Sequence, residues 1–294
     1  MEKLKINLSI GSLDKELSEM KEKLFSEHQD IVLQLKSHNV PDEIIEKYLV
    51  KILDHAESQK YCENCKGQKA CKKVNPLLSS ELFFDGKVIE QRLTPCKEVL
   101  EDMAAANNFL INDMNQNNIN ATCISLDKNK KEPARKINEY FSTKQSKWIY
   151  LYGNLRTGRS YLASAFANKA AKKSIGTICY IDVPFRFKEL YDKSFSDLSA
   201  YSSLLETIKT CDVLVLDDFG NEIKNDYIRD GILNLILTAR ADKKLLTIIT
   251  SDYTIDEIET LYATSKAGAI RAKQIKNLLK SNSEVYNLGS ISIY

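Results

Sequence analysis

The sequence contains no long hydrophobic run and almost no excess of one charge. No stretch of about 18 apolar residues occurs, and the N-terminal segment has no uninterrupted apolar stretch of the kind that a signal peptide requires. We therefore expect a soluble, cytoplasmic protein that does not bind a membrane. Lys and Arg number 42 against 40 Asp and Glu, a formal net charge of +2. A surface for nucleic acid would therefore have to be local.

Glycine and proline are also scarce, with 10 Gly and 5 Pro among 294 residues. Hydrophobic residues make up 43% of the chain and charged residues 28%. This composition excludes a disordered chain and favours a globular, helix-rich protein. The length suits one core of roughly 150 residues together with a smaller unit.

The order of the residue patterns predicts three segments. Residues 1–106 combine helical periodicity, broken near residues 38–40, with a cysteine cluster and a short hairpin. Residues 107–135 are rich in Asn, Asp and Lys, which is typical of a linker. Residues 136–294 alternate apolar runs with helical segments, which indicates an α/β fold with a parallel sheet covered by helices. The apolar runs lie at 148–152, 177–183, 213–217, 245–251 and 285–293.

Four of the seven cysteines cluster at Cys62, Cys65, Cys71 and Cys96. In a chain without a secretion signal, such a cluster indicates a metal rather than disulfides. Four thiolates can hold zinc tetrahedrally, and zinc would supply folding energy that so small a unit cannot obtain from its own core. The alternative is free or redox-active cysteines. His55 is either a substitute ligand or a solvated helix residue.

A phosphate-binding pattern directly follows the first apolar run. Residues 153–160 match G-x-x-x-x-G-K-[ST] and open into an Ala-rich helical segment, except that Arg159 replaces the lysine. Such a loop closes backbone N–H groups around phosphates at a helix N-terminus. We predict an ATP site with Ser160 as a Mg²⁺ ligand, against the alternative of a plain strand-turn-helix junction. The predicted site comprises Gly153, Asn154, Leu155, Arg156, Thr157, Gly158, Arg159, Ser160 and Tyr161.

Polar residues end two further apolar runs. Asp217 and Asp218 follow VLVL, and neighbouring carboxylates repel each other unless a cation or a polar edge receives them. We predict that Asp217 binds Mg²⁺ and Asp218 orients the attacking water, with a solvated strand end as the alternative. Asp252 ends LLTIITSD, where it either senses the γ-phosphate or belongs to a helix N-cap.

Together these motifs resemble the bacterial primosomal helicase loaders of the DnaI/DnaC type, a branch of the AAA+ ATPases. LYGNLRTGRSYL, VLVLDDFGNE, IRDGILNLILTAR and TSDY carry the resemblance, which covers about residues 136–294. The cysteine region resembles the zinc-binding, helicase-contacting domain of the DnaI subtype. The resemblance implies an ATP-controlled protein that binds the hexameric replicative helicase and helps to place it on single-stranded DNA during replication initiation.

The resemblance also implies self-association, because an arginine of a neighbouring subunit completes the nucleotide site in this family. Arg271 is the candidate by position, although one alignment places Asn277 there. Asp252 stands where the family usually has Asn, which exchanges a hydrogen-bond donor for an acceptor. With Arg159, whose planar fork does not replace a lysine ammonium, these departures predict a slow or impaired ATPase. The short stretch after the last apolar run predicts that the C-terminal lid is absent.

Other functions remain open at this point. A basic helix could meet the phosphates of single-stranded DNA or could simply be solvated. Its basic residues are Lys266, Arg271, Lys273, Lys276 and Lys280. A transposition helper ATPase would share the fold, although the cysteine-rich segment argues against it. A non-catalytic helicase-binding adaptor with a decayed P-loop is the third alternative.

Overall fold

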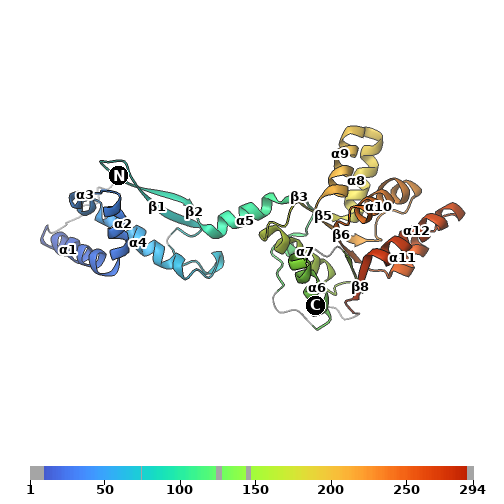
Figure 1. Cartoon of the computed structure of the whole chain (residues 1–294), viewed down its shortest axis with the longest axis horizontal. Coiled ribbons are helices and arrows are strands. Elements are labelled where there is room, and N and C mark those ends of the chain that lie inside the picture. Colours follow the sequence, from blue (N-terminus) through green and yellow to red (C-terminus); the bar gives the residue numbers. More distant parts are fainter. Residues whose placement is uncertain (1–9, 74, 124–127, 144–146, 290–294) are drawn as a thin grey trace, which may run out of the picture. The chain divides into compact units, whose positions relative to one another are not determined.

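The chain divides into two compact units, Met1–Asp102 and Met103–Tyr294 (Figure 1). The computed structural model describes residues 10–73, 75–123, 128–143 and 147–289. Across these ranges no helix has both the length and the hydropathy that a membrane span would need. The helix α5 (Lys97–Asn107) contains the boundary between the two units.

Among the described residues of the first unit, four α-helices and one hairpin come before α5. The helices are α1 (Ile10–Glu27), α2 (Gln29–Ser37), α3 (Asp42–Lys47) and α4 (Leu49–Glu63), and the hairpin pairs β1 (Leu78–Phe84) with β2 (Ile89–Pro95). Leu24, Ile45 and Ile52 are fully buried at the centre of its core. The predicted helix break is confirmed between α2 and α3, where Pro41 caps the new helix. The predicted hairpin is also confirmed, with its turn held by the Asp85 carboxylate.

His55 on α4 is not the solvated residue that the sequence suggested. Its side chain is buried, and its Nδ1 lies 3.0 Å from the Ser80 hydroxyl of β1. Burial lowers the pKa of His55, so the ring is held neutral near pH 7. His55 therefore links α4 to the hairpin. The helical periodicity around residue 55 could not reveal this contact, because Ser80 of β1 lies 25 positions away in the sequence.

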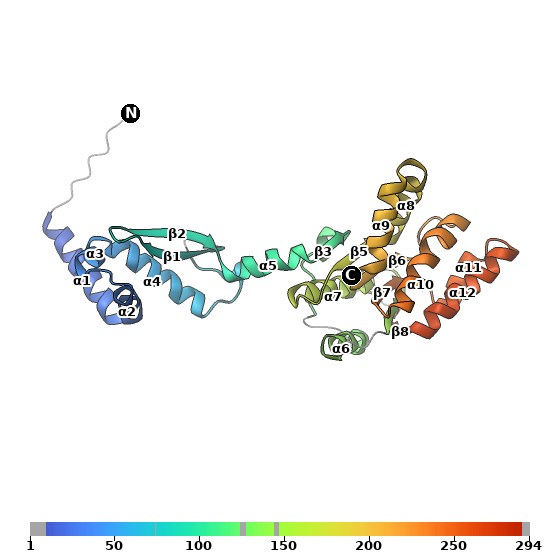
Figure 2. The same cartoon turned by 45° about the horizontal axis from the view of Figure 1, so that its top comes forward.

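The second unit contains a six-stranded sheet in the order β3-β5-β6-β7-β4-β8. Figure 2 labels β3, β5, β6, β7 and β8 of this sheet. Its strands are β3 (Phe109–Asn112), β4 (Trp148–Tyr152), β5 (Ile178–Asp182), β6 (Val213–Phe219), β7 (Leu246–Ser251) and β8 (Ser283–Asn287). Every neighbouring pair is parallel. The five predicted apolar runs thus correspond to β4 to β8, and residues 290–293 of the last run lie outside the described residues.

Helices cover both faces of this sheet. The helices are α6 (Lys128–Thr143), α7 (Arg159–Lys172), α8 (Val183–Ser196), α9 (Leu198–Thr210), α10 (Asn234–Asp242), α11 (Ile255–Tyr262) and α12 (Lys266–Asn282), with a π-helical turn at Ile228–Leu233 before α10. Alternate residues of β4 belong to two different cores. Ile149 and Leu151 pack with α6 and α7, whereas Trp148 and Tyr150 pack in the core of the other five helices. Fully apolar strands are needed because neither face meets water.

The polar segment 107–135 is not a structureless linker in the residues that the structure describes. It contains β3 at the sheet edge, the 3-10 turn Gln116–Asn118 and the start of α6. Its polar side chains make specific bonds. Asn108 donates to the Ala171 carbonyl at 2.9 Å, and Asp113 accepts two bonds from Arg186. Composition alone cannot distinguish side chains that cap an edge strand from side chains that are simply solvated.

Candidate functional site

The P-loop runs from the end of β4 into α7. Gly153 has φ 154°, and a Cβ there would lie 2.8 Å from the Gly289 carbonyl oxygen, so only glycine fits. Gly158 is the N-cap of α7 in the left-handed region, with φ 85°. The buried Thr157 donates from Oγ1 to the Asn154 carbonyl at 2.9 Å. These contacts fix a loop that ends at the amino-terminal end of a 14-residue helix, the geometry that favours an anion.

The remaining predicted loop residues lie in different surroundings. Asn154, Leu155 and Arg156 are exposed, and the Asn154 N–H already donates to the Gly289 carbonyl at 3.2 Å. Ser160 is partly buried in the first turn of α7. The Tyr161 hydroxyl faces Thr122, whose N–H lies 3.3 Å away. The second half of the loop, around Gly158, is therefore the part that lies at the N-terminus of α7.

Arg159 is 4% exposed and forms an ion pair with Asp252. Its Nη2 donates to one carboxylate oxygen of Asp252, and the other oxygen accepts a bond of 2.8 Å from the Asn221 side chain. The second terminal nitrogen, Nη1, is buried without a hydrogen-bond partner among the described residues. The two residues that differ from the family pattern, Arg159 and Asp252, thus form an ion pair with each other. The sequence positions considered one at a time could not reveal this pairing.

Asp217 lies in β6 with both carboxylate oxygens engaged. Tyr180 of β5 donates to Oδ2 at 2.8 Å, and Thr250 of β7 donates to Oδ1. The flanking strands therefore hold the carboxylate in one orientation. The sequence placed Thr250 among polar residues that could sense the γ-phosphate, but it gave no role to Tyr180, because a hydroxyl within an apolar strand is also compatible with simple packing.

Asp218 adopts a strained backbone conformation. Its φ is 57°, and the register of β6 against β7 shifts between Leu216 and Phe219. Its N–H donates to the Thr250 hydroxyl at 3.0 Å. Burial, reinforced by the neighbouring Asp217 charge, raises the pKa of Asp218 to about 6, although the Arg159 charge opposes the shift. A carboxylate with a pKa in this range is suited to accept a proton near neutral pH.

The three acidic residues and Arg159 come together at one edge of the sheet. β6, β7 and β4 are consecutive neighbours, so their carboxyl ends bring Asp217, Asp252 and the P-loop side by side. This is the edge at which open α/β sheets bind ligands. Ser160 and Asp217 offer oxygen donors of the type that Mg²⁺ prefers, so the predicted magnesium ligands fit this chemistry.

Arg271 is not joined to that edge within one chain. It is exposed on α12, where its Nη1 donates to Gln274 at 3.1 Å. Two other basic residues of the same helix, Lys276 and Lys280, pair with Asp256 of α11, each at 2.8 Å. Of the five basic residues predicted to meet DNA, Lys276 and Lys280 therefore also have a structural role between α11 and α12.

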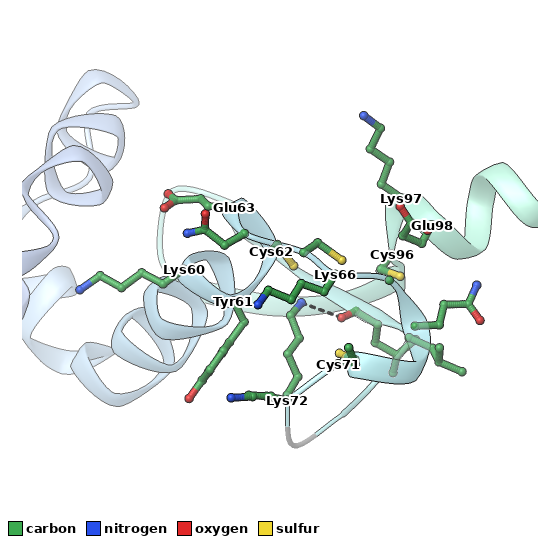
Figure 3. A pocket seen from close by; sticks show the side chains of 18 of the residues that line it. Lys60, Tyr61, Cys62, Glu63, Lys66, Cys71, Lys72, Cys96, Lys97 and Glu98 are labelled. Atoms are coloured by element: carbon green, nitrogen blue, oxygen red, sulfur yellow. Dashed lines mark hydrogen bonds between the residues drawn. The ribbon is translucent and has the colours of Figure 1, made fainter. Parts of the chain in front are cut away.

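The four clustered cysteines line one cavity of about 560 Å³ in the first unit (Figure 3). Cys62 lies in the last turn of α4, Cys65 and Cys71 flank the 3-10 turn Gln68–Ala70, and Cys96 follows β2. All four are free thiols. Among the described residues, however, no three His, Cys, Asp or Glu side chains are grouped closely enough to hold a metal ion. The donor set suits zinc, but zinc remains a prediction because the thiols are not assembled around one point.

Comparison with known proteins identifies related chains. No protein-family model matches the sequence. The replicative helicase loader DnaI of Bacillus subtilis strain 168 is 28% identical over 269 residues, which cover 86% of this chain and 84% of that protein. The chain is similar to the helicase loaders of the DnaI/DnaC type. The resemblance inferred from its motifs is therefore confirmed.

Solved structures support the same fold. A crystal structure of DnaI has a TM-score of 0.55 and 24% identity, and covers 62% of this chain and 97% of its own. A protein from Streptococcus pyogenes serotype M3 has a TM-score of 0.52 and 21% identity, covering 65% and 98%. At these identities the likeness concerns the fold alone. The predicted fold class, a P-loop AAA+ parallel sheet covered by helices, is confirmed.

Proposed function

We propose that this chain binds ATP with Mg²⁺ and loads a hexameric replicative helicase onto single-stranded DNA. The observation that carries the proposal is the junction of the P-loop with the oriented carboxylate of Asp217 at one sheet edge. The relative from Bacillus subtilis is described as a replicative helicase loader, which supplies the biological role. Replication initiation in the cytoplasm is the setting that this role implies.

The residues divide the work of holding the nucleotide. The α7 N-terminus and the backbone around Gly158 receive the phosphates, while Ser160 and Asp217 hold Mg²⁺. Tyr180 and Thr250 orient the Asp217 carboxylate and leave lone pairs on both of its oxygens for the ion. Bound Mg²⁺ would neutralise the charge of the phosphate oxygens.

Hydrolysis is proposed to be slow. Asp218 is placed to accept a proton from water, since its carboxylate lies at the sheet edge next to Asp217, the proposed Mg²⁺ ligand. The pattern usually has a lysine at position 159, whose ammonium is mobile. Arg159 is instead held in an ion pair with Asp252. Completion of the site by Arg271 from a neighbouring subunit fits its exposed position, and self-association would be needed for that step.

The first unit is proposed to be the zinc-bearing helicase adaptor. Cys62, Cys65, Cys71 and Cys96 would draw together around Zn²⁺ in the cavity that they line. Lys66, Lys72 and Lys97 line the same cavity (Figure 3). In the second unit, the exposed Lys266, Arg271 and Lys273 are the proposed contacts to single-stranded DNA phosphates.

Native mass spectrometry of the chain mixed with its host's replicative helicase tests this function. We expect a defined complex whose stoichiometry or stability changes with Mg–ATP. Asp217→Asn should keep the complex and lose the response to nucleotide, whereas Asp256→Asn, which alters a surface carboxylate, should keep both. A complex that is indifferent to ATP would favour the non-catalytic adaptor. If no complex formed, the helicase-loader proposal would fail and the transposition helper would be favoured.

A further inference from the structure

The guanidinium of Arg159 has one terminal nitrogen with a hydrogen-bond partner and one without, among the described residues. Nη2 donates to Asp252, while Nη1 is buried and has no acceptor among the described residues. Only 4% of Arg159 is exposed to solvent. A buried donor of a charged group without an acceptor is costly, so this nitrogen is suited to an anionic ligand.

The position of Arg159 in the P-loop indicates which anion that would be. The side chain at this position of the pattern reaches the β- and γ-phosphates of a bound nucleotide. A guanidinium can donate to two oxyanions at once from its two sides, whereas an ammonium is a point charge. With Nη2 engaged by Asp252, Nη1 is left for one phosphate group.

The Asp252 carboxylate is fixed where it lies. It follows β7 directly and is held from two sides, by Arg159 at Oδ1 and by Asn221 at Oδ2, at 2.8 Å for the latter. A carboxylate and a terminal phosphate are both oxyanions that accept from guanidinium. Asp252 therefore takes one of the two anionic places beside Arg159.

The charges at this edge oppose a further anion. Asp217, Asp218 and Asp252 lie near the cation Arg159, and Asp182 is among the groups whose charge also acts on Asp218. A terminal phosphate would add its charge close to Asp252, and like charges at short range in a partly buried site repel strongly. A nucleotide without that phosphate avoids this repulsion.

We propose that the site does not prefer a nucleoside triphosphate to the corresponding diphosphate. Arg159 Nη1 binds the β-phosphate, Asp252 occupies the place beside Nη2 that a γ-phosphate would otherwise take, and Mg²⁺–ADP binds at least as tightly as Mg²⁺–ATP. Asp252 is then the residue that determines the number of phosphates. The inference rests on the proposed nucleotide binding and sharpens it, because it makes the diphosphate form the resting state of the chain.

Isothermal titration of the full-length chain with Mg–ADP and Mg–ATP tests this directly. We expect the dissociation constant for ATP to equal or exceed that for ADP. Asp252→Asn should shift the ratio toward ATP by at least about tenfold, because it removes the competing charge. Asp256→Asn, which alters a carboxylate of α11 whose side chain is 63% exposed, should leave the ratio unchanged.

The double variant Arg159→Lys with Asp252→Asn guards against a folding defect, because it replaces both members of the ion pair together, with a compact ammonium and a neutral amide. It should fold and prefer ATP. A merely structural role for Asp252 would change both affinities alike and leave the ratio fixed, which would overturn the inference. So would a parent chain that binds ATP about tenfold more tightly than ADP. If neither nucleotide bound to any folded variant, the proposed ATP binding itself would fail with it.

Discussion

The two candidate sites differ in how much of their geometry the protein holds without a ligand. At the sheet edge, hydrogen bonds from Tyr180 and Thr250 fix Asp217, and Arg159 is paired with Asp252. In the first unit, the four cysteines line one cavity, but among the described residues no metal-binding group is assembled. A site held by neighbouring strands can be formed before its ligand arrives, whereas a site on short turns depends on the ligand itself.

The largest effect is expected when metal is removed from the first unit. Purified protein should contain about one Zn²⁺ per chain, and a chelator should increase hydrogen exchange in residues 62–73, because structural zinc contributes roughly 10 kcal/mol or more to local folding. Helices α1 to α4 should retain protection, since their core includes the fully buried Leu24, Ile45 and Ile52.

Elemental analysis and hydrogen-exchange mass spectrometry make the measurement. Cys62→Ser should lose zinc, and Cys123→Ser, outside the cavity, should retain it. A chain that contains no zinc and does not respond to the chelator would mean that the cysteines are simply free thiols.

The next largest effect is expected when the buried Arg240 of the second unit is replaced, which should lower the free energy of unfolding. Arg240 is fully buried, and its guanidinium donates to the Cys211 carbonyl at 2.8 Å and to the Thr247 hydroxyl at 2.9 Å. Arg240→Leu should lower the free energy of unfolding by about 3 kcal/mol, because several buried acceptors lose their donor. Arg271→Leu, on the exposed face of α12, is the matched control and should change stability little. Urea denaturation measures the free energy of unfolding of both variants. An equal loss of stability in Arg240→Leu and Arg271→Leu would contradict the structural role of the Arg240 hydrogen bonds.

Thr250→Val tests whether the hydrogen bond from Thr250 is needed to orient the Asp217 carboxylate. The hydroxyl donates to Asp217 and accepts from the Asp218 N–H, so its removal should lower the free energy of unfolding by about 1–3 kcal/mol and weaken Mg–nucleotide binding. Thr250→Ser keeps the hydroxyl and should restore most of both properties. Calorimetric titration measures the binding, and unchanged affinity in Thr250→Val would show that Asp217 needs no support from β7.

The smallest effect concerns the pH dependence of the α11–α12 contact. Hydrogen bonds from Lys276 and then Lys280 lower the pKa of Asp256 to about 2. Because this is below the unfolded value of about 3.9, the ionised form stabilises the fold, fully above about pH 4, and this stabilisation is lost as the pH falls through about 2.

Carbon-detected NMR titration should show the pKa of Asp256 rising toward its ordinary value in Lys276→Gln/Lys280→Gln. Lys273→Gln on the same helix should leave that pKa unchanged. A normal pKa in the parent chain would indicate that the two lysines are solvated and do not pair with Asp256.

The sequence predicted the sheet more fully than the site. Continuous apolar runs located β4 to β7 because these strands are covered on both faces, whereas β8 is exposed at Val285 and Asn287 and overlaps only the start of its predicted run. The edge strand β3 was missed because alternate residues of it are only partly buried and the others are exposed, and its neighbours Asn108 and Asp113 are polar. A residue pattern cannot show which polar side chains have a partner elsewhere in the chain.

The same reason explains what was missed at the nucleotide site. The P-loop and Asp217 follow local patterns and could be located from them. Arg159 and Asp252, 93 positions apart, were each interpreted separately from the sequence, which could not show that the two side chains form an ion pair in the folded chain. His55 and Ser80 form another such pair, within the first unit. Contacts between distant positions are decided by the fold.

The most direct test of the central claim measures helicase bound to circular single-stranded DNA. The host's replicative helicase should be incubated with this DNA in the presence and absence of the chain and Mg–ATP, and the helicase retained on the DNA should be quantified after removal of free protein. We predict that the chain increases the retained helicase several-fold and that Cys62→Ser, which disrupts the adaptor unit, abolishes the increase. Retention that is the same with and without the chain would contradict the helicase-loader function.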